Sequence, residues 1–147
     1  MTTGLLVIDL QRGMFMEAQP PHDGEAVLAR VAELLGRARG HGAPVLHVQH
    51  DGGPGDLLGK PGVGWEIHPD VAPLADEPVI GKSRCSAFPG TTLDAHLKLL
   101  GISRIVVAGM QTEFCIDTNC RAAFDLGYKV VLASPDGTAD GDWRAEE

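Results

Sequence analysis

The sequence has few aromatic residues, an excess of acidic over basic residues, and no long apolar run. Aromatic residues make up only 5% of the chain, too few for a surface that stacks nucleic-acid bases. There are 12 Lys and Arg against 20 Asp and Glu, and the formal net charge is −8. That balance argues against binding to nucleic acid or to an anionic membrane, since both need a basic face. No stretch approaches the roughly 18 apolar residues of a transmembrane helix.

Cysteine is scarce as well. Its 3 residues form no disulfide framework, and no CxxC pair points to a zinc site. The N-terminus has neither the basic segment nor the cleavage site of a signal peptide. Free thiols without a leader predict a cytoplasmic protein. The length of 147 residues and the 44% hydrophobic content predict one ordinary globular domain over residues 1–147.

Apolar runs alternate with segments of helical spacing along the chain. The predicted strands are residues 5–8, 44–49, 78–80, 105–108 and 129–133. The predicted helices are residues 24–39, 91–100 and 115–126. Residues 51–78 are rich in Gly and Pro and predict a long functional loop. The alternation predicts an α/β fold in three α/β/α layers, with a mainly parallel sheet in the middle.

Three residues are candidates for catalysis. Cys115 opens a predicted helix, where the helix dipole and unpaired N–H groups favour a thiolate; a small buried residue is the alternative. Asp9 ends the first predicted strand, where a carboxylate needs a partner, although it could simply cap a neighbouring segment. Lys82 follows the third predicted strand and could equally be a solvated lysine. Because parallel strands share one carboxyl edge, a nucleophile, a proton acceptor and a cation could meet there.

Other residues have weaker indications. Phe15, Trp65 and Phe114 are candidates for lining a substrate pocket, with ordinary packing as the alternative. Arg84 could steer an acidic substrate or be a solvated surface residue. We expect the remaining thiols, Cys85 and Cys120, to serve packing, and Phe124 to lie with Cys120 on the buried side of the helix at 115–126.

Three short segments carry a resemblance to a known family. They are Leu-Val-Ile-Asp-Leu-Gln at 6–11, Gly-Lys-Ser-Arg-Cys-Ser-Ala-Phe at 81–88 and Gly-Met-Gln-Thr-Glu-Phe-Cys at 109–115. In this order they resemble the catalytic blocks of isochorismatase-like cysteine hydrolases. That superfamily includes nicotinamidases, N-carbamoylsarcosine amidases, ureidoacrylate and biuret amidohydrolases, and isochorismatases. The resemblance runs over residues 4–140.

The resemblance implies a Rossmann-like fold and a catalytic triad. Asp9 would be the general base and later the acid, Lys82 the electrostatic partner, and Cys115 the nucleophile. It also implies a non-proline cis peptide between Met110 and Gln111 and an oxyanion hole formed by the N–H groups of Gln111 and Cys115. It further implies a homo-oligomer, either a dimer or a tetramer.

The sequence departs from the family in two places. Nicotinamidases hold a metal through an Asp-x-His pattern and a further His, which the stretch His-Val-Gln-His-Asp-Gly-Gly at 47–53 does not match. We therefore expect no metal and no cofactor, with an ion held by His50, Asp51 and His68 as the alternative. Residues 141–147 resemble the opening turn of a helix, and the family continues with that helix and a strand. We expect both to be missing, so that the domain is incomplete at its C-terminus.

These observations predict a cysteine-dependent hydrolase of a small carboxamide or ureido substrate, acting through a thioester. Two alternatives stay open. One is an isochorismatase-type hydrolase of a vinyl ether. The other is a catalytically silent thiol protein that senses redox state on the same scaffold.

Overall fold

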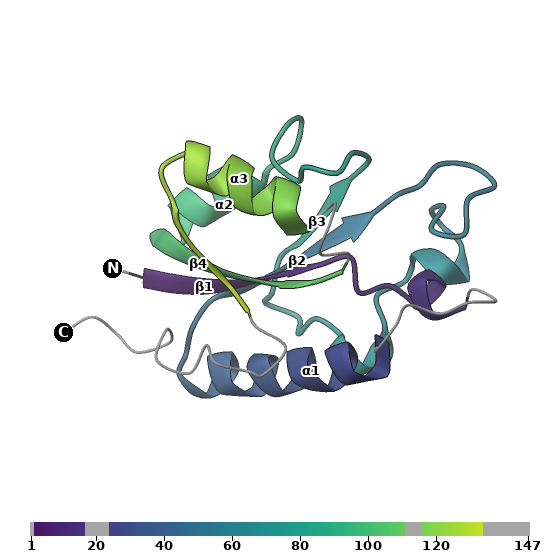
Figure 1. Ribbon diagram of the computed structural model, residues 1–147, viewed down its shortest axis with the longest axis horizontal. Helices are drawn as coiled ribbons and strands as arrows, with labels where there is room; N and C mark the ends of the chain where they lie inside the picture. The colour runs from purple at the N-terminus through teal and green to yellow at the C-terminus, as the bar shows by residue number, and fades with distance from the viewer. Residues whose placement is uncertain (1, 17–23, 111–115, 134–147) are drawn as a thin grey trace.

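The computed structural model describes residues 2–16, 24–110 and 116–133 (Figure 1). Its centre is a 5-stranded sheet in the order β3-β2-β1-β4-β5, in which all neighbouring strands are parallel. The strands are β1 (Thr2–Ile8), β2 (Val45–His50), β3 (Val79–Lys82), β4 (Ile102–Gly109) and β5 (Lys129–Leu132). The predicted mainly parallel sheet is therefore confirmed.

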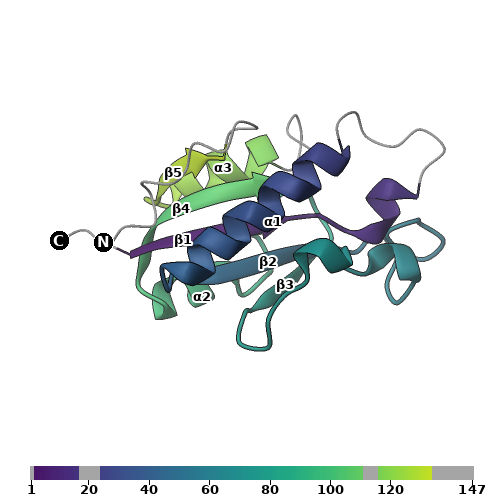
Figure 2. The same cartoon turned by 90° about the horizontal axis from the view of Figure 1, so that it is seen from below.

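Helices cover both faces of this sheet. Helix α1 (Gly24–Gly40) lies on one face, and α2 (Leu93–Leu99) and α3 (Asp117–Asp125) lie on the other (Figure 1). Seen from below, α1 runs over β1 with β2 on one side and β4 on the other (Figure 2). The predicted three-layer α/β/α architecture is therefore confirmed. No helix in the described ranges is long and apolar enough to cross a membrane.

Each face of the sheet packs into its own apolar core. In β1, Leu5 and Val7 pack toward α1, and Leu6 and Ile8 pack toward α2 and α3. All four side chains are buried, which explains why the strand is a continuous apolar run rather than an alternating one. The central strand is thus fixed from both sides, and its carboxyl end is held firmly.

The predicted burial pattern holds for α1 but fails at one position in α3. In α1 the buried apolar side chains are Leu28, Val31, Leu34, Leu35 and Ala38, as the helical spacing predicts. In α3, Ala123 is fully buried whereas Phe124 is 72% exposed. The prediction for Phe124 was wrong because Asn119 and Ala123 are at the centre of the contact face, and Phe124 lies one position further round the helix.

The long segment between β2 and β3 has little regular structure. It contains two short 3₁₀ turns, η2 (Val63–Trp65) and η3 (Pro69–Val71), and a third, η1 (Arg12–Phe15), follows β1. An isolated antiparallel bridge joins Gln11 to Ile67. This bridge brings the middle of the segment to the carboxyl edge of the sheet, where the candidate residues also lie.

Candidate active site

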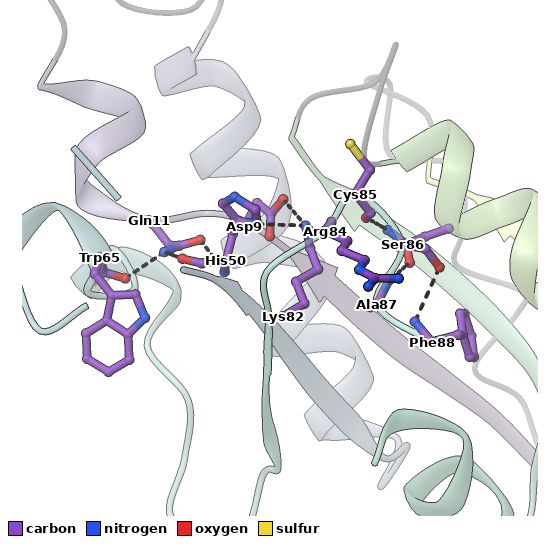
Figure 3. A network of polar contacts seen from close by, with 11 residues as sticks. Asp9, Gln11, His50, Trp65, Lys82, Arg84, Cys85, Ser86, Ala87 and Phe88 are labelled. Carbon is purple, nitrogen blue, oxygen red and sulfur yellow. Dashed lines mark hydrogen bonds and ion pairs between the residues drawn. The ribbon is translucent and has the colours of Figure 1, made fainter. Parts of the chain in front are cut away.

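Asp9 and Lys82 form a buried ion pair at the carboxyl edge of the sheet (Figure 3). Asp9 directly follows β1, and its N–H donates to the carbonyl of Val48 at 3.0 Å. Lys82 is the last residue of β3, and its Nζ lies 3.2 Å from Asp9 Oδ2. The Lys82 side chain is 0% exposed and that of Asp9 is 5% exposed. A carboxylate and an ammonium that are both buried must be paired, and here they are.

Two further acceptors surround the Lys82 ammonium. Its Nζ donates to the carbonyl of Arg84 at 2.8 Å and lies 3.3 Å from His50 Nδ1. Because an ammonium can only donate, Nδ1 of His50 is the acceptor in this contact. His50 therefore belongs to the site, although the sequence analysis considered it only as a possible metal ligand. Its position at the end of β2, between β1 and β3, is the signal that could have found it.

The Gln11 side chain hydrogen-bonds to several backbone groups at this edge of the sheet. Its Nε2 donates to the carbonyls of His50 and Trp65, both at 2.8 Å, and its Oε1 accepts from the N–H of His50 at 2.8 Å. Gln49 Nε2 also donates to the Trp65 carbonyl, at 2.9 Å. Gln11 is fully buried. A buried amide that both donates and accepts links the end of β2 to the segment that carries Trp65, a role that the sequence analysis missed.

A cavity of about 530 Å³ opens beside the pair. Its lining includes Trp65, Lys82, Arg84, Lys60 and Asp51. The volume is within the usual range of roughly 300–1,000 Å³ for small-molecule sites. Of the predicted pocket residues, Trp65 is at this cavity. Phe15 packs instead with the α1 core and edge-on to His68.

Several predicted residues lie outside the described part of the chain. These are Gln111, Phe114 and Cys115, together with the predicted cis peptide after Met110 and the predicted helix turn at 141–147. The residues on either side of 111–115 are placed. The N–H of Met110 donates to the carbonyl of Ile8 at 3.0 Å, one residue before Asp9. Ile116 is buried in the same core as Ile8.

The other two thiols lie away from the ion pair. Cys85 is exposed and Cys120 is half-buried. Cys120 packs against the core under α3, as expected. Burial and the nearby Asp117 raise the pKa of the Cys120 thiol. Cys85 is not a packing residue, because its side chain is exposed. Its carbonyl accepts a hydrogen bond from the side-chain amide of Asn119 at 2.9 Å.

The three possible metal ligands have separate partners. His50 faces Lys82, and His68 lies against Phe15 and accepts an N–H of η3 at 3.1 Å. Asp51 Oδ1 accepts two backbone N–H groups of the loop that follows, and these bonds lower its pKa. Among the described residues no group of three His, Cys, Asp or Glu side chains is placed to share a metal ion. The expectation of no metal stays a prediction.

A second buried polar cluster lies on the α1 side of the sheet. Glu77 accepts hydrogen bonds from Arg39 at 2.7 and 2.8 Å and lies 3.0 Å from Nε2 of His47. Burial opposes ionisation of Glu77, but the hydrogen bonds from Arg39, the Leu74 N–H and His47 outweigh it and lower its pKa to about 2. Burial lowers the pKa of His47. This cluster fixes the segment before β3 onto α1 and takes no part in the cavity.

Comparison with known proteins agrees with this architecture. The family model described as "Isochorismatase domain" matches residues 3–146. A streptothricin hydrolase from Streptomyces noursei is 38% identical over 87% of this chain and 46% of its own length. The ureidoacrylate amidohydrolase RutB from Variovorax paradoxus is 31% identical over 89% of this chain and 48% of its own length. The chain thus spans about half the length of these two relatives.

A solved structure shows the same fold. The isochorismatase from Pseudomonas putida superposes with a TM-score of 0.85 at 31% identity, over 89% of this chain and 68% of that one. The predicted family resemblance and the predicted fold class are both confirmed. With a family model that covers nearly the whole sequence, the chain belongs to the isochorismatase family of hydrolases.

Proposed function

We propose that this protein hydrolyses a C–N bond in a small carboxamide or ureido compound, with Cys115 as the nucleophile. The observation that supports this is the buried Asp9–Lys82 pair, 3.2 Å apart, at the edge of a cavity of about 530 Å³. A carboxylate held there by the Lys82 ammonium is suited to take and return one proton. To form a complete active site, the pair needs a nucleophile and a substrate carbonyl beside it.

The position of β4 supports the assignment of the nucleophile. Met110 is hydrogen-bonded to Ile8, next to Asp9, and Cys115 follows Met110 by five residues. Five residues span at most about 17 Å, and Ile116 is fixed in the core that contains Ile8. The chain length therefore allows Cys115 to approach Asp9 in the proposed site. Helix α3 begins two residues after Cys115, at Asp117, and the N-terminal end of a helix favours a thiolate.

The reaction would proceed in two half-reactions. Sγ of Cys115 attacks the carbonyl carbon while Asp9 takes the thiol proton, and the N–H groups of Gln111 and Cys115 hold the oxyanion. Asp9 then returns the proton to the leaving nitrogen as the C–N bond breaks, which leaves a thioester. Water, deprotonated by Asp9, attacks the thioester and releases the acid and the thiol. Lys82 keeps the Asp9 carboxylate in place throughout, and the scheme uses no metal or cofactor.

The relatives guide the choice of substrates to test. One is named a streptothricin hydrolase and another a ureidoacrylate amidohydrolase. Both names describe hydrolysis, and the second describes cleavage at an amide-type bond. We propose an amide or ureido substrate for this chain on that basis, together with the thiol that the sequence supplies. The setting we propose is a cytoplasmic homo-oligomer, a dimer or a tetramer, whose mass sedimentation equilibrium would measure.

The experiment is a substrate panel with Cys115→Ala and Cys85→Ser. We would test primary amides, ureidoacrylate, streptothricin and isochorismate. The proposal expects turnover of an amide or ureido compound that Cys115→Ala abolishes and Cys85→Ser leaves intact, with an acylated Cys115 seen by intact-mass spectrometry.

Two results would contradict it. Isochorismate turnover that survives in Cys115→Ala would identify a vinyl ether hydrolase. Absence of all turnover, with reversible oxidation of Cys115, would identify a silent thiol protein.

A further inference from the structure

The side chain of Asn119 is fully buried in an apolar part of the molecule. It lies on α3 and is 0% exposed. Ile116 and Ala123, three residues before it and four residues after it, belong to the apolar core of this face of the sheet. Asparagine is a weak helix former, and a buried amide costs free energy unless its donor and its acceptor are both bonded. The presence of an amide here therefore depends on the hydrogen bonds that it makes.

The Asn119 amide bonds to the loop that follows β3, residues 83–88. Its Oδ1 accepts from the N–H of Ala87 at 2.7 Å, and its Nδ2 donates to the carbonyl of Cys85 at 2.9 Å. The carbonyl of Ala87 accepts in turn from the Thr91 hydroxyl. One side-chain amide thus satisfies a backbone N–H and a backbone carbonyl two residues apart, and it holds the loop against α3 at two points.

This loop also supplies an acceptor for the Lys82 ammonium. Nζ of Lys82 donates to the carbonyl of Arg84 at 2.8 Å and lies 3.2 Å from Asp9 Oδ2 (Figure 3). The Arg84 carbonyl is one peptide group before the Cys85 carbonyl that Asn119 binds. An ammonium on a flexible stem takes its direction from its acceptors. The position of the loop therefore helps to determine where Lys82 presents its charge to Asp9.

Asn119 lies close in sequence to the proposed nucleophile but acts through the loop. Cys115 precedes Asn119 by four residues, so the helix that holds the loop is also the helix that follows the nucleophile. Lys82 and Arg84 line the cavity, whereas Asn119 is not among the described residues that do. A role for Asn119 would therefore consist in holding the loop and not in contact with a substrate.

We propose that Asn119 is a positioning residue of the active site. Its amide holds residues 83–88 against α3 and thereby keeps the Lys82 ammonium at the Asp9 carboxylate. An amide is required because neither a carboxylate nor an apolar side chain offers a donor and an acceptor together. This inference rests on the proposed function for the reaction that it serves, and it adds a residue that lies outside the cavity.

The first test separates kcat from KM. Asn119→Leu removes both hydrogen bonds, and Asn119→Ala removes them without adding volume and serves where the larger side chain prevents folding. Turnover is measured with ureidoacrylate, or with another compound of the panel that the wild type hydrolyses faster. We expect kcat to fall about tenfold or more, since a small displacement of a catalytic group has an effect of this size. KM should stay within about threefold, because Asn119 does not line the cavity.

The second test follows Lys82 without any turnover. Its side chain is 0% exposed, whereas that of Lys98 is 69% exposed. Reductive methylation with formaldehyde and a borane should therefore label Lys98 quickly and Lys82 slowly. In Asn119→Leu and Asn119→Ala we expect Lys82 to be labelled about tenfold faster or more, because its loop opens locally with less resistance, while Lys98 keeps its rate. Peptide mass spectrometry gives both rates.

Two further variants distinguish positioning from a general loss of stability. Asn119→Thr supplies a hydroxyl that can donate and accept, and it should restore part of kcat and part of the protection of Lys82. Tyr128→Phe removes the hydrogen bond from the Tyr128 hydroxyl to Asp94 at 2.5 Å in the same core and keeps the ring. Because that bond does not involve residues 83–88, kcat and Lys82 labelling should stay within about twofold of the wild type.

The outcomes distinguish this inference from the proposed reaction. If no compound of the panel is hydrolysed, the reaction fails on these substrates, and Lys82 labelling alone decides the role of Asn119. Faster labelling of Lys82 that Asn119→Thr partly reverses would support the inference even then. Three results would overturn it: unchanged kcat and labelling in the Asn119 variants, equal losses in Tyr128→Phe, or a loss confined to KM.

Discussion

Asp9 combines a buried charge with an unusual backbone. Its φ of 58° makes it the non-glycine residue with positive φ in the described part of the chain. Such a conformation costs of order 1–3 kcal/mol and is typical of functional positions. It turns the chain sharply after β1, and the carboxylate lies 3.2 Å from Lys82. Both residues are candidates from the sequence alone, but the distance between them depends on three strands lying side by side, which the spacing along the chain does not predict.

Substitutions of Asp9 and Lys82 should have strongly non-additive effects on the free energy of unfolding. Lys82→Met leaves the Asp9 carboxylate buried without its cation, and Asp9→Asn leaves the ammonium buried. We expect each to lower the free energy of unfolding by about 3–5 kcal/mol. The double variant should lose clearly less than the sum, because neither charge is then left alone. Asn is the replacement of choice because it tolerates the positive φ.

Urea denaturation of the four proteins measures this coupling. The exposed i,i+4 pair of Arg121 and Asp117 is the matched control, and we expect no measurable coupling there. Additive losses at Asp9 and Lys82 would show that the pair is solvated in solution.

The three thiols should differ in reactivity. Cys85 is exposed, and Cys120 is half-buried with a raised pKa, so Cys85 should be alkylated faster than Cys120 at every pH. If Cys115 is the nucleophile, its rate should exceed both and level off at a pH well below about 8.5. Peptide mass spectrometry after timed iodoacetamide treatment gives the three rates. A Cys115 that reacts as slowly as Cys120 would contradict the proposed reaction.

At the scale of single elements, the sequence predicts the structure best where burial in the fold dictates which positions are apolar. The run Leu5–Ile8 is apolar at every position because both faces of β1 are buried, and the spacing of α1 follows its contact with the sheet. The bridge from Gln11 to Ile67 had no such pattern. It depends on backbone groups far apart in the chain, since Arg12 donates to Glu66 and His68 donates to Leu10, and periodicity carries no information about such contacts.

Gln11 should control the order of the segment that carries Trp65. Gln11→Met would leave the carbonyl and N–H of His50 without their partner, at a cost of about 1–3 kcal/mol for each buried group. Gln49→Met removes only one of the two donors to the Trp65 carbonyl and should cost less. Hydrogen exchange reports this directly at the N–H of His68, which donates to Leu10. Equal protection in the two variants would show that Gln11 has no special role.

Glu77 should make stability depend on pH. Its folded pKa of about 2 lies below the ordinary 4.5, so its contribution is complete above about pH 4.5 and is lost as pH falls toward 2. The loss is at most about 3 kcal/mol. Glu77→Gln should therefore flatten the stability curve between pH 2 and 4.5, measured by urea denaturation. Glu33→Gln, which removes an exposed partner of Arg37, is the control and should leave the curve almost unchanged.

At the scale of the whole molecule, stability depends on the close contact between β1 and β4. Gly109 pairs with Ile8 and has φ +134°, and a Cβ there would lie 2.0 Å from the Ile8 carbonyl oxygen. Gly109→Ala should therefore push the two central strands apart and cost at least about 3 kcal/mol. It should also displace Asp9 and Met110, the residues that follow. Gly81→Ala in β3, where a Cβ meets nothing within 4 Å, is the control. Thermal unfolding of both variants measures the difference.

The strand order also governs how the chain is made. β1 is the middle strand, but it leaves the ribosome before every strand that it pairs with. Its register partners in β2 begin at Val45 and those in β4 begin at Ile102. At roughly 5–20 residues per second of synthesis, its second edge stays open for several seconds after the first has closed. During that interval the nascent chain exposes an unpaired apolar edge, which is the kind of surface that chaperones bind and that aggregation uses.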